Sequence, residues 1–237
     1  MLTALVVIPL RDSTPMGIKA KILGLSMGMA QNIPASRDKW VNMTPLIFGD
    51  YQDPALQRGD APVPFQNRAS RMVNVRNACL DRIKSSLKAS PVDVVIFMDA
   101  DVMLTLTDLA SLAVCSHEGN AIVAPVVLFE REQKNGALRF YDTRGFVGMD
   151  RKLVRMQYPF FPLVPGSETM VELLSVGTVY AVPAALLDSQ FRYTDIAGFT
   201  EHLSLCNHAR SRGYKVFMCR NITVIHEDLT KYGEKDH

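Results

Sequence analysis

The chain of 237 residues is 48% apolar and 21% charged, which is typical of a globular domain with a full core and excludes a disordered protein. Its net charge of +2 argues against a nucleic-acid partner, and no apolar run reaches the ~18 residues that span a bilayer. The cysteines lack CxxC spacing, so neither a zinc site nor a disulfide framework is expected, which favours the cytoplasm. A domain cut from a longer anchored chain of the Golgi lumen would have the same composition.

Strand-like and helix-like segments alternate along the chain, which predicts an α/β fold. Residues 5–10 form the first expected strand and lead into a helix expected over 17–32. A short strand is expected over 45–50, and the proline-containing stretch 51–66 is expected to be a loop.

The middle of the chain carries its most regular patterns. Apolar residues at helical spacing predict a helix over 68–88, and the continuous apolar run over 94–98 predicts a buried strand. Thr105 or Thr107 can cap the next helix, which is expected over 108–116.

The second half begins with another buried strand, expected over 120–127, and then becomes irregular. Residues 130–170 are rich in turn-forming and aromatic side chains, which is typical of a functional or mobile segment. A strand is expected over 175–182, beginning at Gly177, with a short helix from Pro183.

The last expected helix covers 200–212, with Thr200 as its cap and Gly213 as its end. Two strand pieces are expected after it, over 215–219 and 222–225.

Two aspartates, Asp99 and Asp101, directly follow the apolar strand 94–98. Because side chains alternate along a strand, both carboxylates point the same way and repel each other unless positive charge lies between them. A divalent metal that also binds a phosphate-bearing ligand would supply that charge at the carboxyl edge of a sheet. The plainer alternatives are a pair of solvated aspartates at a turn, or Asp101 acting as a helix cap.

Four polar residues are candidates for contacts with a nucleotide. Arg11 and Asp12 lie in the turn after the first strand, and Arg76 and Asn77 lie on the helix before Asp99. An arginine can bind a phosphate through paired hydrogen bonds, and an asparagine within a strong helix implies a specific partner. Taken alone, Arg76 and Asn77 would be ordinary helix residues.

Three late residues are candidates for catalysis or metal binding. Glu201 and His202 begin the last helix and could face an acceptor or the reacting centre, although a glutamate there also suits the positive helix end. His226 ends the last strand and could supply a third metal ligand beside Asp99 and Asp101.

The order of these features, from about Val6 to Asp228, resembles a GT-A glycosyltransferase. Within that fold the chain looks most like the fungal mannan-polymerase mannosyltransferases. The motifs that carry this resemblance are Arg76-Asn77, Asp99-Ala100-Asp101-Val102, Val176-Gly177-Thr178 and Thr200-Glu201.

The resemblance implies a GT-A fold with a mixed, mostly parallel sheet flanked by helices. It implies a single domain, with a nucleotide-binding half over about 1–128 and an acceptor half over about 129–237. The implied activity is transfer of a hexose, mannose in those enzymes, from a nucleoside-diphosphate sugar to a glycan or other acceptor hydroxyl. Mn²⁺ or Mg²⁺ would be the cofactor, and a homo-oligomer stays open.

The resemblance also distributes roles among the candidate residues. The metal would be held by Asp99, Asp101 and His226, and Glu201 and His202 would be catalytic. The donor would be contacted by Arg11, Asp12, Arg76, Asn77, Asp99 and Gly177, where Gly177 lets a sugar approach the backbone or simply marks a bulge.

Other protein classes share parts of the pattern. A haloacid-dehalogenase-like phosphatase also places Asp-x-Asp after an apolar strand, with the first aspartate as nucleophile. A non-catalytic nucleotide-sugar-binding protein would carry the same motifs without turnover. The inverting family that includes polysaccharide synthases has Glu-Asp where this chain has Glu201-His202, which weakens an inverting mechanism.

Overall fold

The structure is a computed structural model that describes residues 1–10, 14, 16–29, 31–36, 38–48, 65–130, 139–140, 145–151, 169–188, 190–196 and 199–227. Its helices are α1 (Met16–Met29), α2 (Phe65–Ala89), α3 (Leu106–Gly119), the short 3₁₀ helix η1 (Ala184–Leu186) and α4 (His202–Ser211). Its strands are β1 (Leu2–Pro9), β2 (Asn32–Ser36), β3 (Lys39–Phe48), β4 (Val94–Met98), β5 (Val102–Met103), β6 (Ala121–Phe129), β7 (Arg139–Phe140), β8 (Val147–Gly148), β9 (Met170–Ser175), β10 (Val179–Pro183) and β11 (Lys215–His226).

The strands form a mixed sheet in the order β2-β3-β1-β4-β10-β6-β11-β9-β8. β1 pairs parallel with β3 and β4, and β11 pairs parallel with β6, whereas β10 runs antiparallel between β4 and β6. The carboxyl ends of β1, β4, β6 and β11 therefore share one edge of the sheet with the amino end of β10.

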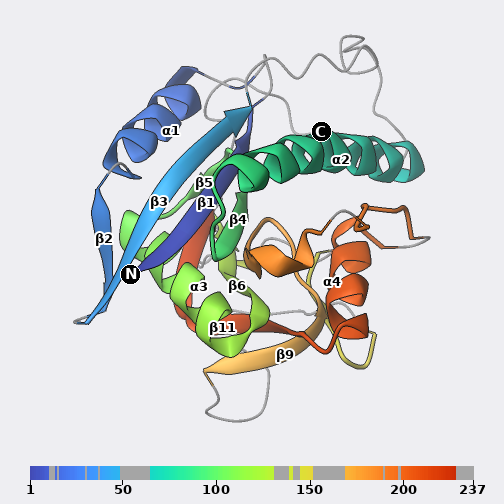
Figure 1. Cartoon of the computed structure of the whole chain (residues 1–237). Helices are drawn as coiled ribbons and strands as arrows, with labels where there is room; N and C mark the ends of the chain where they lie inside the picture. Colours follow the sequence, from blue (N-terminus) through green and yellow to red (C-terminus); the bar gives the residue numbers. More distant parts are fainter. Residues whose placement is uncertain are drawn as a thin grey trace.

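Helices flank this sheet (Figure 1). α3 packs across β6, β10 and β4, α1 packs on β3, and α4 packs on β9 and β11. The expected α/β fold with a mixed sheet and flanking helices is confirmed. None of the helices in the described part of the chain combines the length and the apolarity needed to cross a membrane.

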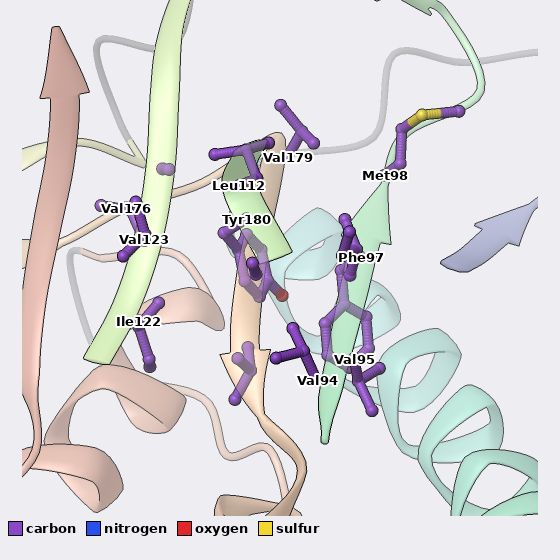
Figure 2. Packing of buried hydrophobic residues seen from close by; sticks show 14 of the residues in the cluster. Val94, Val95, Phe97, Met98, Leu112, Ile122, Val123, Val176, Val179 and Tyr180 are labelled. Carbon is purple, nitrogen blue, oxygen red and sulfur yellow. The ribbon is translucent and has the colours of Figure 1, made fainter. Parts of the chain in front are cut away.

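The core is centred on β4, as its apolar run predicts. Phe97 stacks on its cross-strand partner Tyr180 (Figure 2), with ring centroids 5.2 Å apart. Tyr193 meets Phe97 edge-on at 6.4 Å. Every residue of β4 is buried, because neighbouring strands and helices cover it. The residues that follow it are thereby held on a rigid support.

One expected strand is longer than its pattern indicated. β3 begins at Lys39 rather than at residue 45, and β2 pairs with its first part as an antiparallel neighbour. Pro45 is tolerated within β3 because β2 pairs no further than Asn42, and no other strand of the described residues pairs with Pro45 on that side. The proline made the strand look shorter than it is.

The last strand is also continuous rather than divided. β11 covers both expected pieces. The polar residues between them form an irregularity in the pairing of β11 with β6, between Cys219 and Thr223. Extra residues in one strand bend it and increase its twist without ending it.

The capping predictions have mixed outcomes. Thr105, rather than Thr107, caps α3 in a reciprocal capping box with Asp108. Gly213 ends α4 with a φ of +82°, and the Tyr214 N–H donates to the Ala209 carbonyl, as in a Schellman motif.

The prediction that Thr200 caps the last helix is wrong. α4 begins at His202, and Glu201 holds the cap position in a helical conformation without a side-chain capping bond. Among the described residues, Thr200 Oγ1 is a buried oxygen without a hydrogen-bond partner. The Leu203 N–H, which a capping hydroxyl at residue 200 would accept, donates instead to the Thr200 carbonyl at 3.1 Å.

Candidate functional site

Asp99 lies just beyond β4 and is held at both its backbone and its side chain. Its N–H donates to the Thr178 carbonyl (3.1 Å), and its Oδ1 accepts from Arg76 Nη2 (2.9 Å). Burial raises the pKa of the Asp99 carboxyl, an effect that the Arg76 charge opposes and the Asp101 charge reinforces. The first aspartate of the motif is therefore paired with an arginine.

Arg76 is a buried cation between two carboxylates from distant parts of the chain. It is 1% exposed, and besides Asp99 it donates from Nε toward Glu201 Oε1 at 3.4 Å. Burial by itself lowers the pKa of Arg76, but the charges of Asp99 and Glu201 help to raise it well above its usual value. The ordinary-helix interpretation of Arg76 is wrong, because its guanidinium joins α2, β4 and α4.

Glu201 and His202 lie behind Arg76 rather than on an open surface. They are 4% and 7% exposed, and His202 Nε2 lies 3.4 Å from Glu201 Oε1. Burial tends to raise the pKa of Glu201, but the neighbouring His202 and Arg76 hold it below its usual value. Glu201 is thus a buried carboxylate that faces the Arg76 guanidinium and the His202 ring.

Two tyrosines extend this network into the core. His202 Nδ1 lies 3.3 Å from the Tyr180 hydroxyl, which lies 3.2 Å from the Tyr193 hydroxyl. Neither tyrosine was among the site residues predicted from the sequence. The available signal was a phenol within the apolar strand β10, since a buried tyrosine hydroxyl needs a polar partner.

Asn77 has the partner that its position in a strong helix implied. Its Nδ2 donates to the Tyr193 carbonyl (3.0 Å), and its Oδ1 accepts from the Tyr193 N–H (2.9 Å). The side chain thereby fixes the chain that carries Tyr193. The nucleotide contact predicted for Asn77 stays a prediction.

Asp101 and His226 meet at the same edge of the sheet, 125 positions apart in the sequence. Asp101 Oδ1 lies 3.2 Å from His226 Nε2, and the His226 Nδ1–H donates to the Glu227 carbonyl at 3.0 Å. Burial by itself lowers the pKa of His226, but the hydrogen bond and charge of Asp101 raise it. The structure thus brings Asp101 and His226 together, and their predicted role as metal ligands stays a prediction.

The donor atoms of this pair suit Mn²⁺ or Mg²⁺. Because Nδ1 is committed to a backbone carbonyl, neutral His226 would present the Nε2 lone pair beside the Asp101 carboxylate. Within the described residues, no three His, Cys, Asp or Glu side chains converge as a complete metal site. Two protein ligands are compatible with these metals when phosphate oxygens and water complete the coordination.

Thr178 marks a strained turn beside Asp99. The expected strand start at Gly177 is wrong, since Gly177 lies between β9 and β10, and β10 begins at Val179. The buried Thr178 carries a φ of 61°, which is unfavourable for a β-branched residue and is typical of functional sites. The strain orients the Thr178 carbonyl toward the Asp99 N–H.

Glu227 is a further buried carboxylate at the site, and it was not among the residues predicted from the sequence. It is 2% exposed, and its carboxylate forms an ion pair with Lys21 of α1. Its N–H donates to the Asp101 carbonyl at 2.7 Å. Arg11 and Asp12, the two remaining candidates, lie outside the described residues.

Comparisons with known proteins support the fold. The chain is similar to the structure of GalNAc-T7 with UDP, GalNAc and Mn²⁺, with a TM-score of 0.50 and 12% identity over 96% of this chain and 44% of that chain. It is also similar to A197 from STIV, with a TM-score of 0.49 and 13% identity over 95% of this chain and 85% of that chain. The chain thus spans less than half of the GalNAc-T7 chain that it matches.

No family model matches the sequence, and no curated protein does. At 12% identity the similarity to GalNAc-T7 shows the fold alone. The mixed sheet with its flanking helices is therefore a GT-A-like fold, the architecture of a class of glycosyltransferases.

Proposed function

We propose that this protein is a metal-dependent glycosyltransferase that moves a hexose from a nucleoside-diphosphate sugar to a hydroxyl of a glycan or other acceptor. The observation that carries the proposal is the pairing of both aspartates of the motif at the carboxyl edge of the sheet. Asp101 lies 3.2 Å from His226, and Asp99 lies 2.9 Å from Arg76. Ligands of open α/β sheets bind at this edge.

We assign the metal to Asp101 and His226, with Asp99 as a further ligand once a donor displaces part of its contact with Arg76. The metal, when bound, would neutralise negative charge on the diphosphate leaving group. Arg76 would add a fixed positive charge on the same side. GalNAc-T7, which shares the fold, was solved with UDP and Mn²⁺, and this supports the choice of ligand class.

In the proposed transfer, the bond from the anomeric carbon to the diphosphate oxygen breaks and its electron pair leaves with the diphosphate. A bond to the acceptor oxygen forms, and the acceptor hydroxyl proton passes to the departing diphosphate or to water. We keep Glu201 and His202 as the residues beside the reacting centre. Glu201 contacts Arg76, and His202 contacts Glu201, so we infer that they act by holding Arg76 and Asp99 in place. We assign the backbone at Gly177, together with Asn77, Arg11 and Asp12, to the donor.

The donor sugar is proposed only as a hexose. The narrower resemblance to fungal mannan-polymerase mannosyltransferases, and hence mannose, has no support from the comparisons. A nucleotide-sugar donor and a glycan acceptor are the proposed partners.

Donor hydrolysis tests the proposal. Wild type and Asp101→Ala would be incubated with UDP- and GDP-hexoses, with and without Mn²⁺, and released nucleoside diphosphate would be measured. We expect release by wild type that depends on Mn²⁺ and falls by at least about 100-fold in Asp101→Ala, since loss of a charged ligand removes several kcal/mol of stabilisation from the leaving group. Equal release by both proteins, or none with any donor, would contradict the proposal.

A further inference from the structure

Glu227 contacts both residues to which the metal is assigned. Its N–H donates to the Asp101 carbonyl (2.7 Å), and its own carbonyl accepts from the His226 ring (3.0 Å). The backbone of Glu227 therefore sets the orientation of the imidazole and the position of the aspartate. Any displacement of Glu227 changes the distance between these two ligands.

The Glu227 carboxylate is buried and is neutralised from another element. Its side chain is 2% exposed and pairs with Lys21 of α1, whose side chain is 51% exposed. Ile18 and Ile22 anchor α1 in the core, and Gly28 brings it close to α3, where an added Cβ would lie 2.6 Å from Leu106 Cδ1. Lys21 therefore lies on a helix that is packed against the core through Ile18 and Ile22.

We propose that the Lys21–Glu227 ion pair is a positioning device for the metal site, which holds Asp101 and His226 at the separation that a divalent cation needs. The inference rests on the proposed function. A buried carboxylate that loses its cation moves toward water or attracts another cation. Because Glu227 is bonded through its backbone to both ligands, its movement would disturb both.

The direction in which metal affinity changes when Lys21 is removed distinguishes a positioning role from simple charge repulsion. An ammonium near a cation site repels the metal, so removal of Lys21 would tighten metal binding if charge alone mattered. Positioning predicts the opposite, since loss of an outer-shell partner usually weakens metal binding by 10–100-fold.

The experiment measures Mn²⁺ binding to the full chain, with the metal alone, from the free-Mn²⁺ signal in electron paramagnetic resonance. For Lys21→Met we expect the dissociation constant to rise by about 10-fold or more. Lys21→Arg keeps the charge and should bind as wild type does. The double variant Lys21→Met/Glu227→Gln removes both charges and should recover most of the affinity.

A matched control comes from the far end of the same sheet. Lys39 at the start of β3 pairs with Glu118 of α3, and both side chains are about half exposed. Lys39→Met removes a lysine of similar exposure from a pair whose carboxylate is exposed rather than buried, and it should leave the dissociation constant unchanged.

An unchanged or lower dissociation constant for Lys21→Met would overturn the inference, and so would a double variant as weak as Lys21→Met. Failure of the proposed function would look different, because wild type and Asp101→Ala would then bind Mn²⁺ equally or not at all. If Lys21→Met does not fold, Lys21→Gln removes the same charge with a polar side chain, and a dissociation constant no higher than that of wild type would again overturn the inference.

Discussion

At the scale of single residues, one buried arginine organises half of the candidate site. Arg76 bridges Asp99 of the β4 end and Glu201 of the α4 start, and these carboxylates would repel each other without it. Removing one partner of a buried ion pair is more damaging than its presence is stabilising, because a charge is left without compensation. The arginine is therefore both a stability residue and the proposed phosphate contact.

Replacement of Arg76 by methionine should lower the free energy of unfolding by about 3–5 kcal/mol, because the buried carboxylate of Glu201 and that of Asp99 lose their common cation. Urea unfolding monitored by circular dichroism measures this change. Arg192→Met breaks the exposed Arg192–Asp81 pair and should change stability by less than about 1 kcal/mol. Equal changes in the free energy of unfolding for the two substitutions would show that Arg76 does not stabilise a buried network of charges.

At the scale of elements, the ends of helices and strands decide where the polar residues lie. Strand β4 ends at Met98, and the strained Thr178 brings the backbone of the β9–β10 connection onto Asp99. The end of α4 turns at Gly213 into β11, the strand that carries His226. The backbone conformation at such ends, at Thr178 and at Gly213, is therefore as important for the site as side-chain chemistry.

The same substitution should have opposite effects at two glycines. Gly24 lies inside α1 with open space around its Cα, so Gly24→Ala should stabilise the protein by up to about 1 kcal/mol. Gly213 has a φ of +82°, so Gly213→Ala should destabilise it by about 1–2 kcal/mol. Urea midpoints of the two variants test this, and shifts in the same direction would be inconsistent with the assigned backbone geometry.

At the scale of the whole molecule, the candidate site draws together segments from all along the chain. Lys21, Arg76, Asp99, Glu201 and Glu227 come from α1, α2, the β4 end, the α4 start and the β11 end. A ligand that binds across these segments should stabilise the native state as a unit, since an unfolded chain offers no such site. The site therefore draws on both the nucleotide-binding and the acceptor halves expected from the sequence.

Mn²⁺ together with UDP or GDP, each at 100 times its dissociation constant, should raise the free energy of unfolding by at least about 2.7 kcal/mol. Differential scanning fluorimetry with and without chelator would measure the shift. In Asp101→Ala the Mn²⁺-dependent part should vanish, whereas Lys39→Met should retain it. A shift of the same size in Asp101→Ala would place the ligand elsewhere.

The sequence by itself determined the α/β class, the buried strand β4 and the approximate positions of the helices, and it indicated an aspartate motif and a late histidine as candidate site residues. These follow from local properties, namely apolar periodicity, the alternation of side chains along a strand and the residue types that suit a metal. Asp99 and Asp101 could be selected because a polar pair directly after an apolar strand is visible within a few residues.

Only the tertiary structure decided which partner each charge takes. Arg76 and Glu201 lie 125 positions apart and Lys21 and Glu227 lie 206 apart, so no local pattern could link them. Likewise, the bulge that keeps β11 continuous and the strained Thr178 depend on neighbouring strands. Burial is what makes these ion pairs specific, because a charge removed from water must find an opposite charge wherever the fold places one.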